Sequence, residues 1–155
     1  MDVNVVLVPE DDKPLLWDKL QDYILELTAY GTHQPVDGVF DYPWFDLYWR
    51  EPNRFPFWAM VGGERTAFAL VHCEERTEMA EFYSFPAFRR TGAALAFARQ
   101  VVKRFPGPWT LSEYRTNHGA VAFWHKVIAP WPFDERVYIG GQGQERLEQT
   151  FTVPG

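Results

Sequence analysis

A short segment of small and basic residues has the composition of a phosphate-binding loop. Residues 85–94 read Phe-Pro-Ala-Phe-Arg-Arg-Thr-Gly-Ala-Ala and lie between a strand-like run at 80–84 and a helical apolar pattern that continues to Phe105. Free N–H groups at a helix start bind phosphate oxygens, and small residues let an anion approach the main chain closely. Arginines add charge and directional donors. We therefore predict a pyrophosphate cradle formed by Arg89, Arg90, Thr91, Gly92, Ala93 and Ala94.

Two blocks of the sequence resemble the GNAT superfamily of N-acetyltransferases. The segment 89–94 resembles the family's Q/R-x-x-G-x-G/A loop, which binds acyl-CoA. It lacks both the Gly-Lys-Ser/Thr ending of a Walker loop and the three-glycine spacing of a dinucleotide fingerprint. The second block, at 108–124, is similar to a strand, the asparagine (Asn117) and the fourth helix of the family. The resemblance is tightest over residues 79–129.

The resemblance implies how the cofactor binds. In the family two neighbouring parallel strands separate, and the pantetheine arm of CoA pairs with the exposed edge; here the strands would be 79–85 and 109–114. Phe82 and Ser84 would then offer main-chain groups to the arm, and Asn117 would contact it through its side chain. Asn117 can also act as a helix cap, and the two roles are compatible. The implied co-substrate is acetyl-CoA, with no metal.

Two carboxylates on these strands are candidates for taking the amine proton. Glu81 is the first candidate, because it lies just before the cofactor-binding end of its strand, where family members often place a base. Glu113 lies on the neighbouring strand, on the same face as Trp109 and Leu111. For each acid, a partnered surface carboxylate is an equally good interpretation.

The proton donor for the thiolate departs from the family pattern. Many members carry a tyrosine seven residues after the asparagine, and this chain has Trp124 there. An indole N–H donates a hydrogen bond but supplies no proton at useful pH. Tyr114, Tyr83 or water would have to replace the missing phenol, unless the thiolate leaves without acid help.

Residues 31–56 combine aromatic rings with acids and are the candidate acceptor site. Rings beside carboxylates suit a cation with an apolar body. The alternative is that the rings cap one end of the sheet. His33 lies in the same region as a further base or substrate contact. The predicted substrate residues are Asp37, Asp41, Trp44 and Tyr48.

The order of predicted elements favours a mixed α/β (α+β) fold. We expect a GNAT-like, splayed sheet of about seven strands with helices on both faces. Gly62-Gly63 is a hairpin signal, Asp11 or Asp12 a helix cap, and Gly31 a helix end. Strands are predicted at 3–8, 57–61, 66–73, 79–85, 109–114, 137–139 and 147–153, and helices at 12–31, 44–49, 91–104 and 117–128.

The overall composition fits a single domain spanning residues 1–155. The net charge of −6 disfavours nonspecific nucleic-acid binding. The only cysteine, Cys73, excludes an internal disulfide and a cysteine metal cluster, and we expect it to be buried rather than nucleophilic. The N-terminus does not read as a signal peptide, and no apolar run approaches the roughly 20 residues of a membrane helix. We therefore expect a cytoplasmic protein without membrane partners.

These observations together predict an acetyl-CoA-dependent N-acetyltransferase that acts on a small primary amine by direct transfer in a ternary complex. The alternative is a non-catalytic acyl-CoA-binding sensor or interaction module of the same fold, which Trp124 favours. The sequence leaves open whether the chain forms a homodimer.

Overall fold

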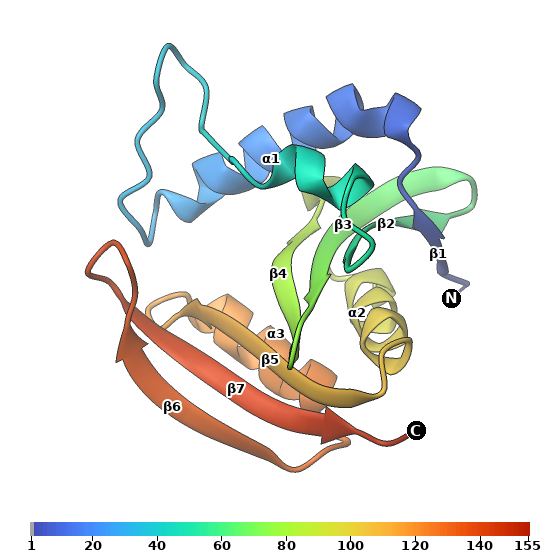
Figure 1. Cartoon of the computed structure of the whole chain (residues 1–155), viewed down its shortest axis with the longest axis vertical. Coiled ribbons are helices and arrows are strands. Elements are labelled where there is room, and N and C mark those ends of the chain that lie inside the picture. The colour runs from blue at the N-terminus through green and yellow to red at the C-terminus, as the bar shows by residue number, and fades with distance from the viewer. Residues whose placement is uncertain (1) are drawn as a thin grey trace.

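A single seven-stranded sheet organises the chain in the computed structural model, which describes residues 2–155 (Figure 1). The strand order is β1-β2-β3-β4-β5-β7-β6. The strands are β1 (Asn4–Leu7), β2 (Arg54–Val61), β3 (Glu64–Cys73), β4 (Thr77–Ser84), β5 (Gly107–Tyr114), β6 (Phe133–Ile139) and β7 (Glu145–Val153). The helices are α1 (Lys13–Leu27), α2 (Ala93–Lys103) and α3 (His118–Ile128), with short 3₁₀ turns at Glu10–Asp12, Phe45–Trp49 and Pro86–Phe88. The predicted mixed α/β fold is confirmed.

Strands β1 to β4 are antiparallel neighbours, and tight turns join the strands of their hairpins. Gly62 and Gly63 connect β2 to β3 with φ angles of 57° and 80°. Both angles lie in the left-handed region that glycine adopts without a steric cost, as the two-residue hairpin turn requires. The hairpin predicted from Gly-Gly is therefore confirmed.

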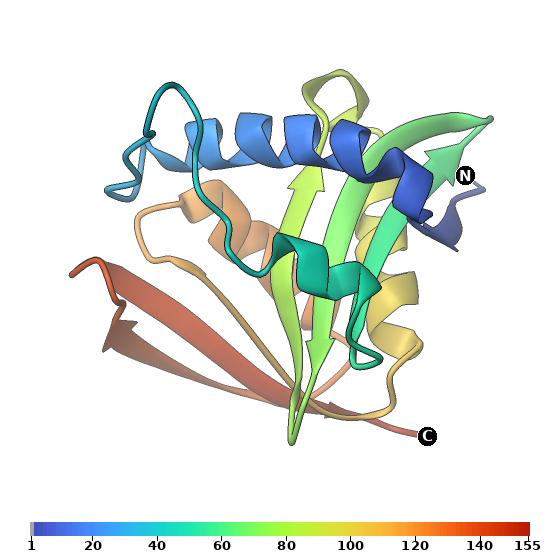
Figure 2. The ribbon, with the colours of Figure 1, turned by 45° about the horizontal axis from the view of Figure 1, so that its top comes forward.

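Strands β4 and β5 form the only parallel pair in the described sheet, and they separate soon after they meet. They are paired at Thr77–Trp109 and Glu78–Thr110 alone. Beyond this point β5 pairs with β7 along its whole length, while β4 continues beside β3 (Figure 2). The predicted splay between 79–85 and 109–114 is therefore present, and it leaves an inner edge of β4 without a strand partner.

The helices cover the sheet on both faces, and each face has its own core (Figures 1 and 2). Residues of α1 pack with Phe68 and Leu70 of β3, which point to one face. Residues of α2 and α3 pack with Ala69 and Val71, which point to the other, as the alternation of side chains along a strand requires. The two cores meet the gap between β4 and β5 from opposite sides.

Two helix boundaries differ from the sequence prediction. Asp12 precedes α1, but its carboxylate does not cap the helix. Its Oδ2 instead accepts hydrogen bonds from Trp58 Nε1 at 3.0 Å and from Arg65 at 3.1 Å, both partners more than 45 residues away in the chain. Helix α1 ends at Leu27 rather than at Gly31. Gly31 is needed for a different reason, because a Cβ there would collide with the Tyr114 hydroxyl.

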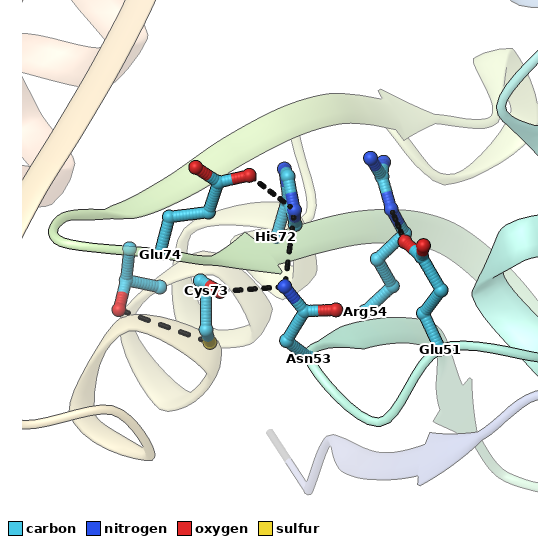
Figure 3. A network of polar contacts seen from close by, with 7 residues as sticks. Glu51, Asn53, Arg54, His72, Cys73 and Glu74 are labelled. Atoms are coloured by element: carbon cyan, nitrogen blue, oxygen red, sulfur yellow. Dashed lines mark hydrogen bonds and ion pairs between the residues drawn. The ribbon is translucent and has the colours of Figure 1, made fainter.

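Cys73 lies in a polar network at the turn between β3 and β4, at the end of these strands where β4 still pairs with β5 (Figure 3). Its thiol is half-buried rather than fully buried, and Thr77 Oγ1 donates to the sulfur at 3.9 Å. Burial raises the pKa of the thiol, which disfavours a nucleophilic thiolate. His72 contacts Asn53 and Glu74, not the sulfur. The network is therefore a structural tie between β3 and the segment before β2.

Candidate active site

A cavity of about 340 Å³ fills the gap between β4 and β5. Its wall combines residues from α1, β4, β5, α3 and β7 and from the loop after α1. The lining residues are Tyr23, Leu27, His33, Met79, Ala80, Glu81, Phe82, Leu111, Ser112, Glu113, Tyr114, Asn117, Ala120, Trp124 and Arg146. Both predicted acids, Tyr114 and Asn117 therefore meet in one place.

The sheet divides this cavity into two parts, because neighbouring side chains on a strand point to opposite faces. We call the part facing α1 the α1 lobe, and the part facing α3 the α3 lobe. The α1 lobe is lined by Tyr23, Leu27, His33, Glu81, Tyr114 and Arg146. The α3 lobe is lined by Phe82, Leu111, Glu113, Asn117, Ala120 and Trp124. The two lobes communicate through the gap between the strands.

Glu81 is held in the α1 lobe by two phenols. Tyr23 Oη donates to Oε1 at 2.9 Å, and Tyr42 Oη donates to Oε2 at 2.9 Å. A β-bulge at Ala80, where Leu70 pairs with Glu81 and Val71 with Met79, sets the direction of this side chain. Burial raises the pKa of Glu81 to about 7, although both phenol bonds act in the opposite direction. Glu81 is therefore poised to exchange a proton near neutral pH.

The second phenol reaches Glu81 because the loop after α1 is tied down. Gln21 of α1 donates to the Phe40 carbonyl at 2.9 Å and accepts from the Phe40 N–H at 2.8 Å. These two hydrogen bonds to the main chain of Phe40 fix the segment that carries Tyr42. Burial and the nearby carboxylate of Glu81 raise the pKa of Tyr42 far above its ordinary range, so this phenol remains a hydrogen-bond donor.

Glu113 lies in the α3 lobe in a different environment. Its side chain is buried, with 5% exposure, and Gln149 Nε2 donates to Oε1 at 2.7 Å. Oε2 is buried without a hydrogen-bond partner among residues 2–155. Burial raises the pKa of Glu113 to about 7, against the opposing effects of Gln149, His125 and Arg146. An unpartnered buried oxygen favours the protonated carboxyl.

Tyr114 takes part in a closed set of hydrogen bonds in the α1 lobe. Gln142 Nε2 donates to His33 Nδ1 at 3.3 Å, which leaves Nε2 as the protonated ring nitrogen facing Tyr114 Oη at 2.9 Å. Tyr114 Oη in turn donates to Gln142 Oε1 at 3.2 Å. Burial and the charge of Arg146 lower the pKa of His33, so the imidazole is neutral at pH 7. The Tyr114 proton is thus engaged away from the α3 lobe.

The predicted phosphate loop has the expected shape. Gly92 precedes α2 with a φ of 86°, and a Cβ added there would meet no protein atom within 4 Å. Thr91 Oγ1 accepts from the Ala93 N–H at 3.3 Å, whereas the N–H groups of Ala94 and Leu95 have no acceptor in the described part of the chain. Open space in front of unpaired N–H groups at a helix start suits a pyrophosphate.

The two arginines of the loop differ. Arg89 is engaged by the protein, because its Nη2 donates to both oxygens of Glu26, at 2.8 and 3.1 Å, and its Nε donates to the Ser84 carbonyl at 3.0 Å. Contact of Arg89 and of the Ser84 main chain with the cofactor stays a prediction, and in this structure Glu26, 63 positions earlier in the chain, is the ion-pair partner of the arginine. Arg90 is exposed, with no ion pair within the described residues.

The main chain at Phe82 and the side chain of Asn117 frame the α3 lobe. Phe85 N–H bonds the Thr66 carbonyl, so alternation of the ladder turns the N–H and C=O of Phe82 away from β3 and into the gap. Asn117 Oδ1 accepts from the Ala120 N–H at 3.2 Å and caps α3, as predicted. Contact of either residue with CoA remains a prediction. Trp124, in place of the usual tyrosine, packs edge-on against the Phe82 ring at 5.0 Å.

The predicted substrate residues do not gather around the cavity. Asp37, Asp41 and Trp44 are exposed, and Tyr48 is buried under the 3₁₀ turn with 3% exposure. None of the four lines the cavity wall. Two other residues of this region belong to the site. His33 lines the cavity, and Tyr42 donates a hydrogen bond to Glu81. A contact between the four predicted residues and an acceptor stays untested.

Several residues of the site were missed by sequence reasoning. Tyr23, Tyr42, Gln142 and Arg146 come from α1, its following loop, the β6–β7 turn and β7. An i, i+4 apolar pattern marks Tyr23 only as a core residue of its helix. No local signal in the sequence marks the other three, because their positions depend on how distant segments pack.

Within residues 2–155, no cluster of three or more His, Cys, Asp or Glu side chains is arranged to hold a metal ion. None of the described helices has the length and apolar character needed to cross a membrane.

Solved structures of the same shape are numerous, although the sequence alone matches no protein-family model and no curated protein. An acetyltransferase of the GNAT family from Streptococcus pneumoniae superposes with a TM-score of 0.67 at 10% identity, over 98% of this chain and 100% of that one. A spermidine N-acetyltransferase variant from Vibrio cholerae gives 0.67 at 12% identity, over 96% and 94%.

An aminoglycoside acetyltransferase solved with coenzyme A and kanamycin gives a TM-score of 0.70 at 13% identity, over 97% of this chain and 95% of that one. The similarity therefore extends over nearly the whole length of both chains. With the splayed β4–β5 pair and the glycine turn before α2, the chain has the fold of the GNAT N-acetyltransferases.

Proposed function

We propose that the protein is an acetyl-CoA-dependent N-acetyltransferase that acts on a small primary amine by direct transfer in a ternary complex. One observation carries this proposal: a half-buried glutamate with a pKa of about 7, held by two phenols, lies at the splay of β4 and β5. The fold supports use of CoA, since similar structures contain it. The single continuous cavity of about 340 Å³ favours a small acceptor.

The residues present fit acetyl-CoA, which supplies an acetyl thioester when bound. The N–H groups at the start of α2 and the exposed Arg90 would hold the pyrophosphate. The main-chain groups of Phe82 that face the gap, together with Asn117, would hold the pantetheine arm. This arrangement brings the reacting end toward the junction of the two lobes.

Glu81 is the base in this proposal. It faces the α1 lobe, where an amine has room to enter beside Tyr23 and Leu27. Its carboxylate takes the proton of the attacking amine, directly or through a water. The two phenols hold both oxygens in place, and their hydrogen bonds favour the ionised carboxylate against the effect of burial.

Glu113 is the proton donor in this proposal. It lies in the α3 lobe, on the cofactor side of the gap, with one oxygen unpartnered. With both pKa values raised to about 7, a protonated Glu113 beside an ionised Glu81 supplies the acid and the base that acid–base catalysis needs. Glu113 would give its proton to the thiolate sulfur and regain one from water. It thereby replaces the phenol that Trp124 excludes.

The experiment that tests the function is release of free thiol from acetyl-CoA with a panel of primary amines. Thiol release that depends on both acetyl-CoA and an amine is the expected result. Binding of CoA without turnover on any amine would instead support the non-catalytic acyl-CoA sensor. Absence of CoA binding would contradict both.

The glycine turn before α2 gives a test of cofactor binding that does not need an acceptor. CoA should raise the melting temperature, because it binds the folded state only. Gly92→Glu should abolish this rise, since it places a carboxylate where the phosphates lie.

Gly63→Glu is the matched control for this variant. Gly63 also has a positive φ, 80°, with open space around it, but lies in the β2–β3 hairpin. Both variants carry the same added charge and a comparable backbone strain of about 1–3 kcal/mol. A CoA-induced rise retained in Gly92→Glu would place the phosphate site elsewhere.

A further inference from the structure

We propose that the amine acceptor carries a carboxylate, and that Arg146 binds it in the α1 lobe. This inference rests on the proposed N-acetyltransferase function and names the chemical class of its acceptor. The acceptor would be an amino acid or another primary amine that also carries an acidic group.

Arg146 is the one lysine or arginine that lines the cavity in the described part of the chain. Within residues 2–155 Arg146 forms no ion pair within 4 Å. Two other arginines near β7 are paired: Arg115, which follows β5, with Glu145 at 2.9 Å, and Arg136 on β6 with Glu148 at 2.7 Å. A half-buried guanidinium without a counter-ion is costly unless something else supplies the negative charge. An acceptor carboxylate would supply it.

The guanidinium is held ready for such a partner. It lies over the Tyr114 ring at 4.5 Å, and its Nη2 donates to Ser112 Oγ at 3.1 Å. Gly140 leaves room for the aliphatic part of the Arg146 side chain, because a Cβ at Gly140 would lie 3.0 Å from Arg146 Cδ. A guanidinium has five N–H donors, so most of them remain available to a planar carboxylate. Fixing the side chain in advance lowers the entropy cost of binding.

The charges of the α1 lobe favour the same class of acceptor. Glu81 receives the proton of the amine, and Arg146 lies near enough to lower the pKa of Glu81 without forming an ion pair with it. His33 is neutral, so Arg146 is the positive charge of this lobe. An acceptor with its amine at Glu81 and its carboxylate at Arg146 matches both ends, with Tyr23 and Leu27 beside its apolar body.

A second ammonium group fits less well. Asp37 and Asp41, the acids expected to attract a cation, do not line the cavity. A diamine would direct its second charge toward Arg146, which repels it. The lobe therefore disfavours polyamine acceptors.

Paired acceptors that differ only by a carboxylate test this inference: phenylalanine against phenethylamine, and 4-aminobutyrate against butylamine. Binding to the CoA-loaded protein is measured by calorimetry, and turnover by thiol release. The carboxylate member of at least one pair should bind more tightly, by roughly 10–100-fold, as a charge-assisted pair of hydrogen bonds provides.

Arg146→Gln should remove this preference, because it should lower kcat/KM for the carboxylate member of a pair much more than for its partner amine, and it should leave the affinity for CoA nearly unchanged. Arg146→Lys, which keeps the charge but loses the paired donors, should give an intermediate preference. Arg136→Gln is the control, because Arg136 is exposed on β6 and paired with Glu148. A melting curve for each variant separates misfolding from loss of binding.

Three outcomes would overturn the inference. One is equal binding of both members of each pair to the wild-type protein, and another is tighter binding of a diamine. The third is an equal fall in kcat for all acceptors in Arg146→Gln, which would show that the guanidinium stabilises the transition state instead of binding the carboxylate. In each case amine-dependent thiol release would leave the proposed function standing. Calorimetric binding of the carboxylate member without any thiol release would contradict the proposed function alone.

Discussion

Replacement of Glu81 by glutamine should lower kcat for acetyl transfer by roughly 10²–10⁴-fold, the usual loss for a general base. The affinity for CoA should be nearly unchanged, because Glu81 faces the α1 lobe and the residues proposed to bind CoA face the α3 lobe. Glutamine keeps the size of the side chain and still accepts one phenol bond, so the fold should be preserved. Steady-state kinetics with a calorimetric Kd for CoA measure both effects.

The pH profile adds a second readout for Glu81. The wild-type rate should fall below about pH 7, because the base must be ionised and its pKa is raised to about 7 by burial. This acid limb should vanish in Glu81→Gln. Glu64→Gln, an exposed change on the neighbouring strand β3, is the control and should keep both rate and limb. Full activity in Glu81→Gln would assign the base to water or to another group.

Replacement of Glu113 by glutamine should also lower kcat by about 10²-fold or more, and it should change the high-pH side of the pH–rate profile. A general acid must be protonated, so the wild-type rate should fall above about pH 7, and this fall should be absent in the variant. Gln149 and Glu135 contact the carboxyl or its partner, and His125 and Arg146 also influence its pKa. Unchanged kcat would show that the thiolate leaves without this acid.

Stability against pH checks the state of Glu113 independently of catalysis. Its pKa is about 7 in the folded protein and 4.5 in an unfolded chain. Between these values the folded state binds more protons, so the free energy of unfolding falls as pH rises. The contribution of the neutral carboxyl is fully present below pH 4.5 and is lost as pH rises through about 7. Glu113→Gln should flatten this slope in denaturant titrations at pH 5 and pH 8.

Much of the fold and the cofactor part of the site followed from local patterns. The strand, glycine turn and helix around Gly92 are contiguous in sequence, and the cap at Asn117 depends on a residue three positions away. The Gly62-Gly63 hairpin is equally local. Such elements are visible because neighbouring residues determine their backbone geometry.

The surroundings of Glu81 in the α1 lobe did not follow, because long-range packing determines them. Arg89 matches a phosphate-loop arginine, yet Glu26 on α1 takes it. Tyr23 and Tyr42 reach Glu81 across 58 and 39 residues of chain, and Gln142 reaches His33 across 109. The aromatic segment 31–56 looked like a substrate pocket, but its rings mostly pack on α1 and the sheet. Composition alone could not distinguish Tyr42, which contacts Glu81, from the aromatic residues of this segment that only pack in the core.

The short pairing between β4 and β5 has a consequence for folding cooperativity. Backbone hydrogen bonds divide the sheet into one unit of β1–β4 and another of β5–β7. The two units share only the residue pairs Thr77–Trp109 and Glu78–Thr110. Helix α2 contacts β1 and β3, α3 contacts β5, and the two helices contact each other. The packing of α2 on α3, and the core beneath them that includes residues of both units, therefore couple the two units. Sub-global opening of the molecule is expected to follow the line of the cavity between β4 and β5.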